Sequence, residues 1–195
     1  MFKKLFLQCG QRSLSLQKQR FKKTEAFDYS QYLKGIKQAL VIFPENNDAF
    51  SAAIKKQVLL EQLFAGVHFT YIVREQYFSL LPNHAKEYSF SLGADDLTVC
   101  QTPSRRFLKQ FELRSFGMVL DLNVEFDLPS TYVAAKIDSN LRICLGQQPE
   151  REPYYNLQVL THSDHTIEEQ IATVFEYLDK LLHPAIDARS GLQPA

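Results

Sequence analysis

The stretch from Phe116 to Gly146 constrains the fold more than any other part of the chain. It reads as a short apolar run, a polar loop leading into a helix-length segment, and a second apolar run: FGMVLDLN, VEFDLPSTYVAAKID and SNLRICLG. This order is typical of one strand–helix–strand unit of a parallel sheet. Strands of such a sheet are covered on both faces and are usually apolar along their whole length. The polar residues that end the first run, Asp121 and Asn123, are therefore informative.

A second unit of the same kind lies earlier in the chain. Ala39–Phe43 is an apolar run, and the polar loop Glu45–Asp48 follows it. We predict a helix over about 49–64, with Asp48 as its N-cap, and then a strand over 67–73. Because crossovers of this kind are right-handed, the two strands should pair in parallel.

The remaining predicted elements continue the alternation of strand and helix. They are a helix at 2–9 interrupted by Gly10, a polar connector to Lys37, a short helix at 74–81, extended pieces at 87–91 and 97–100, a helix at 104–113, a strand at 154–161, and a helix from the Thr166–Glu169 capping box to Leu182. The pattern predicts a single doubly wound, mostly parallel, Rossmann-like α/β sheet with helices on both faces.

We divide the chain into three parts. Residues 1–37 form a basic N-terminal helix and connector, residues 38–183 form the α/β domain, and residues 184–195 form a flexible tail. Its 195 residues are enough for one domain with a real core.

Charge is distributed unevenly along the chain. Seven of the 22 basic residues lie in 1–23, where there is no acidic residue, so the rest carries 15 basic residues against 22 acidic ones. An acidic body disfavours broad nucleic-acid binding. A basic arm of this kind is suited to contact its own acidic domain, an anionic membrane surface or a partner protein. A mitochondrial targeting role and salt-sensitive binding of nucleic acid by the arm are further alternatives.

The cysteines and the missing motifs exclude several classes of protein. Cys9, Cys100 and Cys144 are widely spaced, and we expect free thiols in a reducing cytoplasm. No apolar run approaches the roughly 20 residues of a membrane span. The glycine-rich dinucleotide and P-loop motifs, the nucleophile elbow and the zinc-protease motif do not occur. We expect no cofactor and no metal, and a cytoplasmic location, with peripheral contact with the inner membrane as an alternative.

Polar residues at the carboxyl ends of the two central strands are the candidate ligand-binding residues, because ligands of open α/β sheets lie in the crevice there. They are Glu45, Asn46, Asn47, Asp121 and Asn123, together with Arg142. Asp48 is the candidate catalytic residue, since a carboxylate at such a junction acts as a general base when burial raises its pKa.

Each of these residues also has a simpler explanation. Asp48 is well placed to cap a helix, and Asp121 to accept hydrogen bonds from neighbouring loop amides. Arg142 and Arg151 suit an anionic ligand near that edge, or solvation at the surface.

Two of these stretches carry a resemblance to a known family. MVLDLNVEFDLPSTYVAAKIDSNLRICLG resembles the amino-terminal half of the ADP-heptose:lipopolysaccharide heptosyltransferases, the family-nine glycosyltransferases. ALVIFPENNDAF is similar to the opening strand and loop of that family, where a Gly-Asp pair begins the first helix. The resemblance covers roughly residues 38–182 and implies that Asp48 is the general base. Asn47 stands where the family has glycine.

Members of that family have two Rossmann-like domains, and this chain resembles the first of them. We therefore expect a non-catalytic binding or accessory module that lacks the donor-binding half and binds a partner protein, a glycan precursor or a membrane surface. The alternative is a sugar transferase that a partner chain completes, with Asp48 as general base.

Overall fold

The computed structural model describes residues 2–17, 28–162 and 164–184, and within this part of the chain six parallel strands form one sheet. The strands are β1 (Gln38–Ile42), β2 (His68–Arg74), β3 (Ser89–Leu92), β4 (Phe116–Asp121), β5 (Ser139–Leu145) and β6 (Leu157–Val159). Their order is β3-β2-β1-β4-β5-β6, so the direction of winding reverses between β1 and β4. The predicted doubly wound, Rossmann-like sheet is confirmed.

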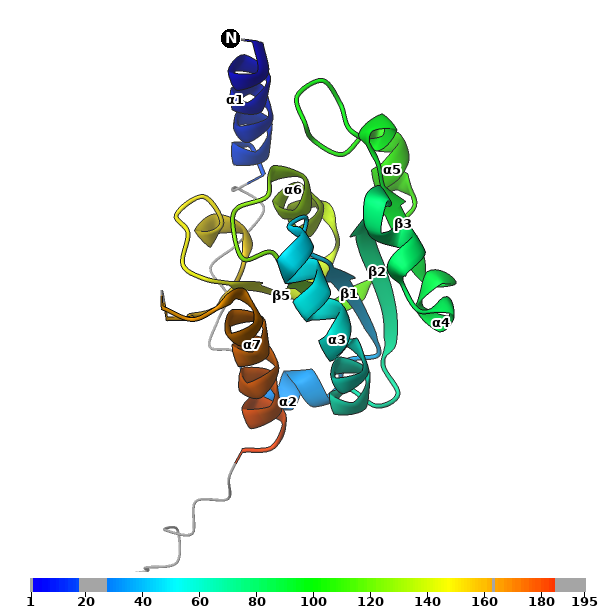
Figure 1. The fold of residues 1–195 in the computed structure, drawn as a ribbon, viewed down its shortest axis with the longest axis vertical. Helices are drawn as coiled ribbons and strands as arrows, with labels where there is room; N and C mark the ends of the chain where they lie inside the picture. Colours follow the sequence, from blue (N-terminus) through cyan, green and yellow to red (C-terminus); the bar gives the residue numbers. More distant parts are fainter. Residues whose placement is uncertain (1, 18–27, 163, 185–195) are drawn as a thin grey trace, which may run out of the picture.

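Helices cover both faces of the sheet (Figure 1). One face packs against α2 (Tyr29–Lys34), α3 (Asn47–Leu63) and α7 (Ile167–Leu182), and the other against α5 (Arg105–Lys109) and α6 (Leu128–Lys136). The N-terminal helix α1 (Phe2–Ser15) packs on α6. The connections also contain α4 (Asn83–Lys86) and the 3-10 turns η2 (Glu75–Leu80), η3 (Ala94–Asp96) and η4 (Glu152–Tyr154). Because strand side chains alternate, Val41 enters the first core and Leu40 the second.

Polar side chains cap the N-termini of the helices that begin near the edge of the sheet. Asn46, and not Asp48 as predicted, is the N-cap of α3, because its side chain accepts hydrogen bonds from the backbone of Asp48 and Ala49 at 2.9 and 3.2 Å. Asp127 caps α6 by accepting from the backbone of Ser130 at 2.9 Å. The predicted capping box of α7, Thr166–Glu169, is confirmed.

Several predicted elements differ from the observed ones. The expected connector before Lys37 contains α2, the extended piece at 97–100 is a loop with a single bridge from Leu97 to Pro103, and the helix at 104–113 ends at Lys109. α1 runs through Gly10, and this glycine allows close packing, because a Cβ atom there would overlap the backbone oxygen of Cys100.

A disulfide between Cys9 and Cys100 joins α1 to the loop before α5. The expectation of three free thiols is therefore wrong for these two, because the docking of Gly10 brings the two sulfurs together. Cys144 is free and buried in β5, where burial raises its thiol pKa to about 12. The tail at 185–195 and the basic residues at 18–23 lie outside the described residues.

Among the helices of the described ranges, none is long and apolar enough to cross a membrane.

The cysteine arrangement predicts a thiol count that depends on the state of the protein. Native protein should show no reactive thiol at pH 8 towards a disulfide reagent such as Ellman's, because Cys144 is buried and neutral and the other two are paired. Denaturation without reductant should expose one thiol, and denaturation with prior reduction all three. Three thiols in the unreduced, denatured protein would contradict the disulfide.

Candidate functional site

A cavity of about 430 Å³ opens at the carboxyl ends of β1 and β4, where the winding of the sheet reverses. We call it the crevice. Its walls are the loop after β1, the loop after β4 and the first turn of α7: Pro44, Glu45, Asn46, Ala49, Asn123, Val124, Glu125, Phe126, Asp127, Ile167 and Gln170. Ligands of open α/β sheets bind at such a switch point, so this is the site that the topology favours.

The loops on the two sides of the crevice are joined through Asn123. Its side-chain oxygen accepts a hydrogen bond of 3.0 Å from the backbone N–H of Glu45. Its side-chain nitrogen and backbone nitrogen donate to one carboxylate oxygen of Asp121, at 2.8 and 3.0 Å. Ile42 and Asp121 are opposite each other in the sheet, so these bonds extend the pairing of β1 and β4 beyond the last strand residues.

Asp121 is fully buried, and a fully buried arginine compensates its charge. Nη2 of Arg151 lies 2.9 Å from the second carboxylate oxygen of Asp121, and the hydroxyl of Tyr155 donates to that same oxygen. Nη1 of Arg151 donates to the backbone oxygens of Asn123 and Leu145 at 2.8 and 3.1 Å. The buried charge thereby fixes the loop that forms one wall of the crevice.

The pKa values in this network follow from burial and charge. Burial by itself would lower the pKa of Arg151, but Asp121 and then Tyr155 outweigh it, so that the pKa lies above its ordinary value. Burial and then the charge of Asp121 raise the pKa of Tyr155 well above its usual range. The tyrosine therefore stays a hydrogen-bond donor at neutral pH.

Arg74, at the end of β2, links two carboxylates of the crevice. Its Nη2 lies 2.7 Å from Asp127 and 3.4 Å from Glu45. Burial raises the pKa of Glu45, Arg74 lowers it and Asp127 raises it, and the net pKa is above the ordinary value. The hydroxyl of Tyr77 donates to the backbone oxygen of Glu45 at 3.0 Å, which fixes this loop as well.

The structure brings together some of the predicted site residues and separates others. Glu45, Asn46 and Asn123 line the crevice, while Asp121 lies buried beneath it. Asn47 and Asp48 are exposed in the first turn of α3 and are not part of the lining.

Arg142 lies elsewhere. Its side chain donates to the backbone oxygens of Ala134 and Ile137, both at 2.8 Å, at the carboxyl end of α6, and burial lowers its pKa. The structure therefore does not bring Arg142 to the crevice.

Sequence reasoning missed Asp127, Phe126 and Gln170 of the lining, and Arg74 beside it. A signal existed for Asp127, because an aspartate two residues before a proline and three before a serine is typical of a helix N-cap. No sequence signal indicated Gln170, which reaches the crevice only because α7 packs beside α3.

The lining of the crevice is rich in hydrogen-bond acceptors. Glu45, Glu125 and Asp127 supply carboxylates, and Asn46 and Gln170 supply amides. Within residues 2–17, 28–162 and 164–184, no group of three or more His, Cys, Asp or Glu residues is arranged to hold a metal ion. Such a surface matches a ligand with several hydroxyl donors.

The ion pair of Asp121 and Arg151 predicts that removal of one partner destabilises the protein much more than replacement of both partners by neutral residues. Arg151→Met should lower the free energy of unfolding by about 3–5 kcal/mol, because it leaves a buried carboxylate uncompensated. The double variant D121N/R151M should recover a large part of that loss. Urea denaturation of the two variants and the wild type measures this, and a loss below about 1 kcal/mol for Arg151→Met would contradict the role of the pair.

The raised pKa of Glu45 predicts a pH dependence of stability. In the window above the ordinary carboxyl range near 4.5 and below the raised value, the folded state binds more protons than the unfolded state, so stability falls as pH rises. Glu45→Gln removes this slope, and its stability relative to the wild type should therefore increase from pH 4 to pH 7. Denaturation series at several pH values measure the difference. An opposite trend would mean that the charge of Arg74 outweighs burial and lowers the pKa of Glu45.

Comparison with known proteins supports the fold. A scan against protein-family models and a search of curated proteins both find no match. Among solved structures, the chain is similar to the E. coli heptosyltransferase WaaC with ADP-2-deoxy-2-fluoro heptose, with a TM-score of 0.51 and 15% sequence identity. The match covers 72% of this chain and 47% of that one, so the chain spans about half the length of the transferase. The protein thus has a glycosyltransferase-like, Rossmann-like α/β fold.

Proposed function

We propose that this protein is a non-catalytic binding or accessory module whose crevice holds a hydroxyl-rich glycan precursor. The observation that carries the proposal is the acceptor-lined crevice at the switch point of the sheet, with Glu45, Glu125 and Asp127 around it. Sugar hydroxyls donate well to carboxylates, and Phe126 adds an apolar surface for a sugar ring. The fold likeness to a sugar transferase supports the same ligand class.

The state of the carboxylates favours binding over acid–base catalysis. Asp127 caps α6 and pairs with Arg74, which also lies 3.4 Å from Glu45. Asp121 is buried, with Arg151, Tyr155 and Asn123 around it. These groups have fixed structural partners, whereas a general base needs a carboxylate in reach of the reacting hydroxyl.

The second candidate is a sugar transferase that a partner chain completes, with Asp48 as general base. It is supported by the exposure of Asp48 in the first turn of α3, beside the crevice residue Asn46, and by a fold match that covers 47% of the transferase chain. A partner protein, contact of the basic arm with an anionic membrane, and a cytoplasmic location stay predictions.

Calorimetric titration of the full chain with ADP-glucose, UDP-glucose and glucose tests the proposal. The wild type should bind at least one of these probes. E45Q/E125Q should weaken that binding about tenfold, because hydrogen bonds to charged acceptors become bonds to neutral ones. The control E87Q/E176Q removes the same charge at exposed positions outside the crevice and should bind like the wild type.

Asp48→Ala separates the two candidates. Under the binding proposal it leaves the titration unchanged, and no sugar transfer occurs in any variant. Transfer to an acceptor that appears with a co-purified partner chain and is lost in Asp48→Ala would instead establish the transferase. Lack of binding to all three probes, or equal binding by E45Q/E125Q and the wild type, would contradict the crevice as the glycan site.

A further inference from the structure

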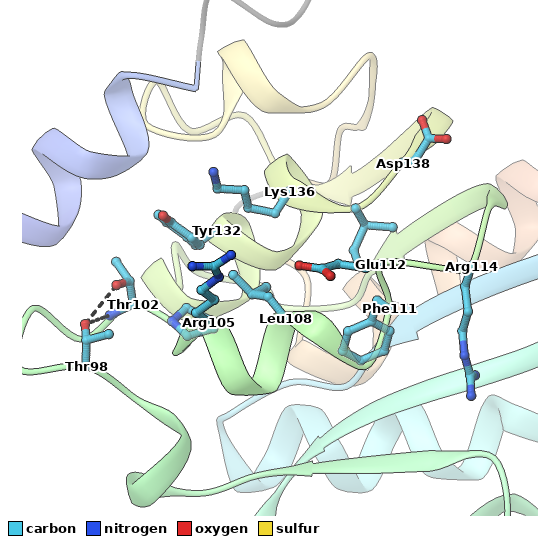
Figure 2. A pocket seen from close by; sticks show the side chains of 12 residues that line it. Thr98, Thr102, Arg105, Leu108, Phe111, Glu112, Arg114, Tyr132, Lys136 and Asp138 are labelled. Atoms are coloured by element: carbon cyan, nitrogen blue, oxygen red, sulfur yellow. Dashed lines mark hydrogen bonds between the residues drawn. The ribbon is translucent and has the colours of Figure 1, made fainter.

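A second cavity, of about 590 Å³, lies on the other side of the sheet between α5 and α6. We call it the groove, and Figure 2 shows the side chains around it. It has no lining residue in common with the crevice. Its lining comes from the loop before α5, from α5 and the turn after it, and from α6 and the residues that follow α6.

Helical spacing places the polar groups on facing walls of the groove. Arg105, Leu108 and Glu112 are three and four residues apart, so they lie on one side of α5 and of the turn that continues it. Tyr132 and Lys136 are four residues apart on α6 and form the opposite wall. Figure 2 shows Arg105 and Lys136 together at the Tyr132 end of the groove.

Two cations therefore face this end of the groove without a carboxylate between them. Neither Arg105 nor Lys136 forms an ion pair with any residue of the described chain, although Glu112 and Asp138 line the same groove. Lys136 has instead a cation–π contact, with its nitrogen 5.7 Å from the centre of the Tyr132 ring. Cations that converge on a hollow create a positive potential that favours an anion there.

The other groups around the groove indicate the chemical nature of the rest of the ligand. The hydroxyls of Thr98 and Thr102, 2.9 Å apart, lie at the cationic end and add hydrogen-bonding capacity for phosphate oxygens. Leu108 and Phe111 give an apolar surface. Glu112 and Asp138 supply exposed carboxylates that accept hydrogen bonds from hydroxyl groups.

We propose that the groove binds the phosphate ester of a sugar or another polyol, with the phosphate at Arg105 and Lys136 and the polyol extending towards Glu112. The cations supply charge-assisted bonds to the phosphate, and arginine adds its forked geometry. The same chemistry occurs in a free sugar phosphate and in the head group of a phosphoinositide, and the experiment below distinguishes these two sources. This site does not depend on the proposed function of the crevice.

Titration of the full chain with glucose 1-phosphate, and co-sedimentation with phosphatidylcholine vesicles that contain phosphatidylinositol 4-phosphate, test the site. R105Q/K136Q should weaken binding at least tenfold for the source that binds. The control R106Q/K109Q removes the same charge from exposed positions of α5 outside the groove and should bind like the wild type. Because Arg105 and Lys136 are not buried, both variants should keep the thermal midpoint of the wild type.

The outcomes distinguish a soluble ligand, a lipid head group and non-specific binding of anions. Binding of glucose 1-phosphate that R105Q/K136Q reduces supports a soluble ligand, and vesicle binding with the same dependence supports a lipid head group. Equal losses in R105Q/K136Q and R106Q/K109Q would show general attraction of anions to α5 and would overturn the proposal. Lack of binding to both probes at millimolar concentration would also overturn it. E45Q/E125Q should leave groove binding unchanged, so failure at the crevice and failure at the groove remain distinguishable.

Discussion

A buried charge at the end of β4 sets a condition that the surrounding structure has to meet. Moving the carboxylate of Asp121 out of water costs several kcal/mol, and the pairing has to offset that cost. Arg151 supplies the opposite charge at 2.9 Å, and Tyr155 and Asn123 supply hydrogen bonds. Because Arg151 and Tyr155 come from the connection between β5 and β6, and Asn123 from the loop after β4, the network ties these two segments to the end of β4.

The crevice depends on this network and on the sheet order. The reversal between β1 and β4 sends α3 to one face and α6 to the other, so the two loops diverge above the strand ends. Asn123 joins the loops at one point, through the backbone of Glu45, and Arg74 joins them at a second, through Asp127 and Glu45. The crevice is therefore held open by fixed partners and is preorganised for a ligand.

The parts of the fold that could be predicted from the sequence are those with a local cause. The strands β1 and β4 are unbroken apolar runs, and the capping box of α7 depends on residues within one turn. β6 was predicted too long, because buried Tyr154 and Tyr155 read as strand residues while they serve a 3-10 turn and the Asp121 network. The same distinction holds for the site. Glu45 and Asn46 follow a strand directly. Arg74 and Asp127, like Cys9 and Cys100, are far apart in the sequence and meet only through the tertiary fold.

The short helix α6 connects the two cavities physically. Its first turn borders the crevice, where Asp127 caps the helix and binds Arg74. Its last turn carries Lys136 into the groove, and Arg142 binds the carbonyl oxygens of that turn. Eight of the nine residues of α6 are buried, and Lys136 is the exception. Because the helix is held at both ends in this way, the same buried segment fixes one wall of the crevice and one wall of the groove.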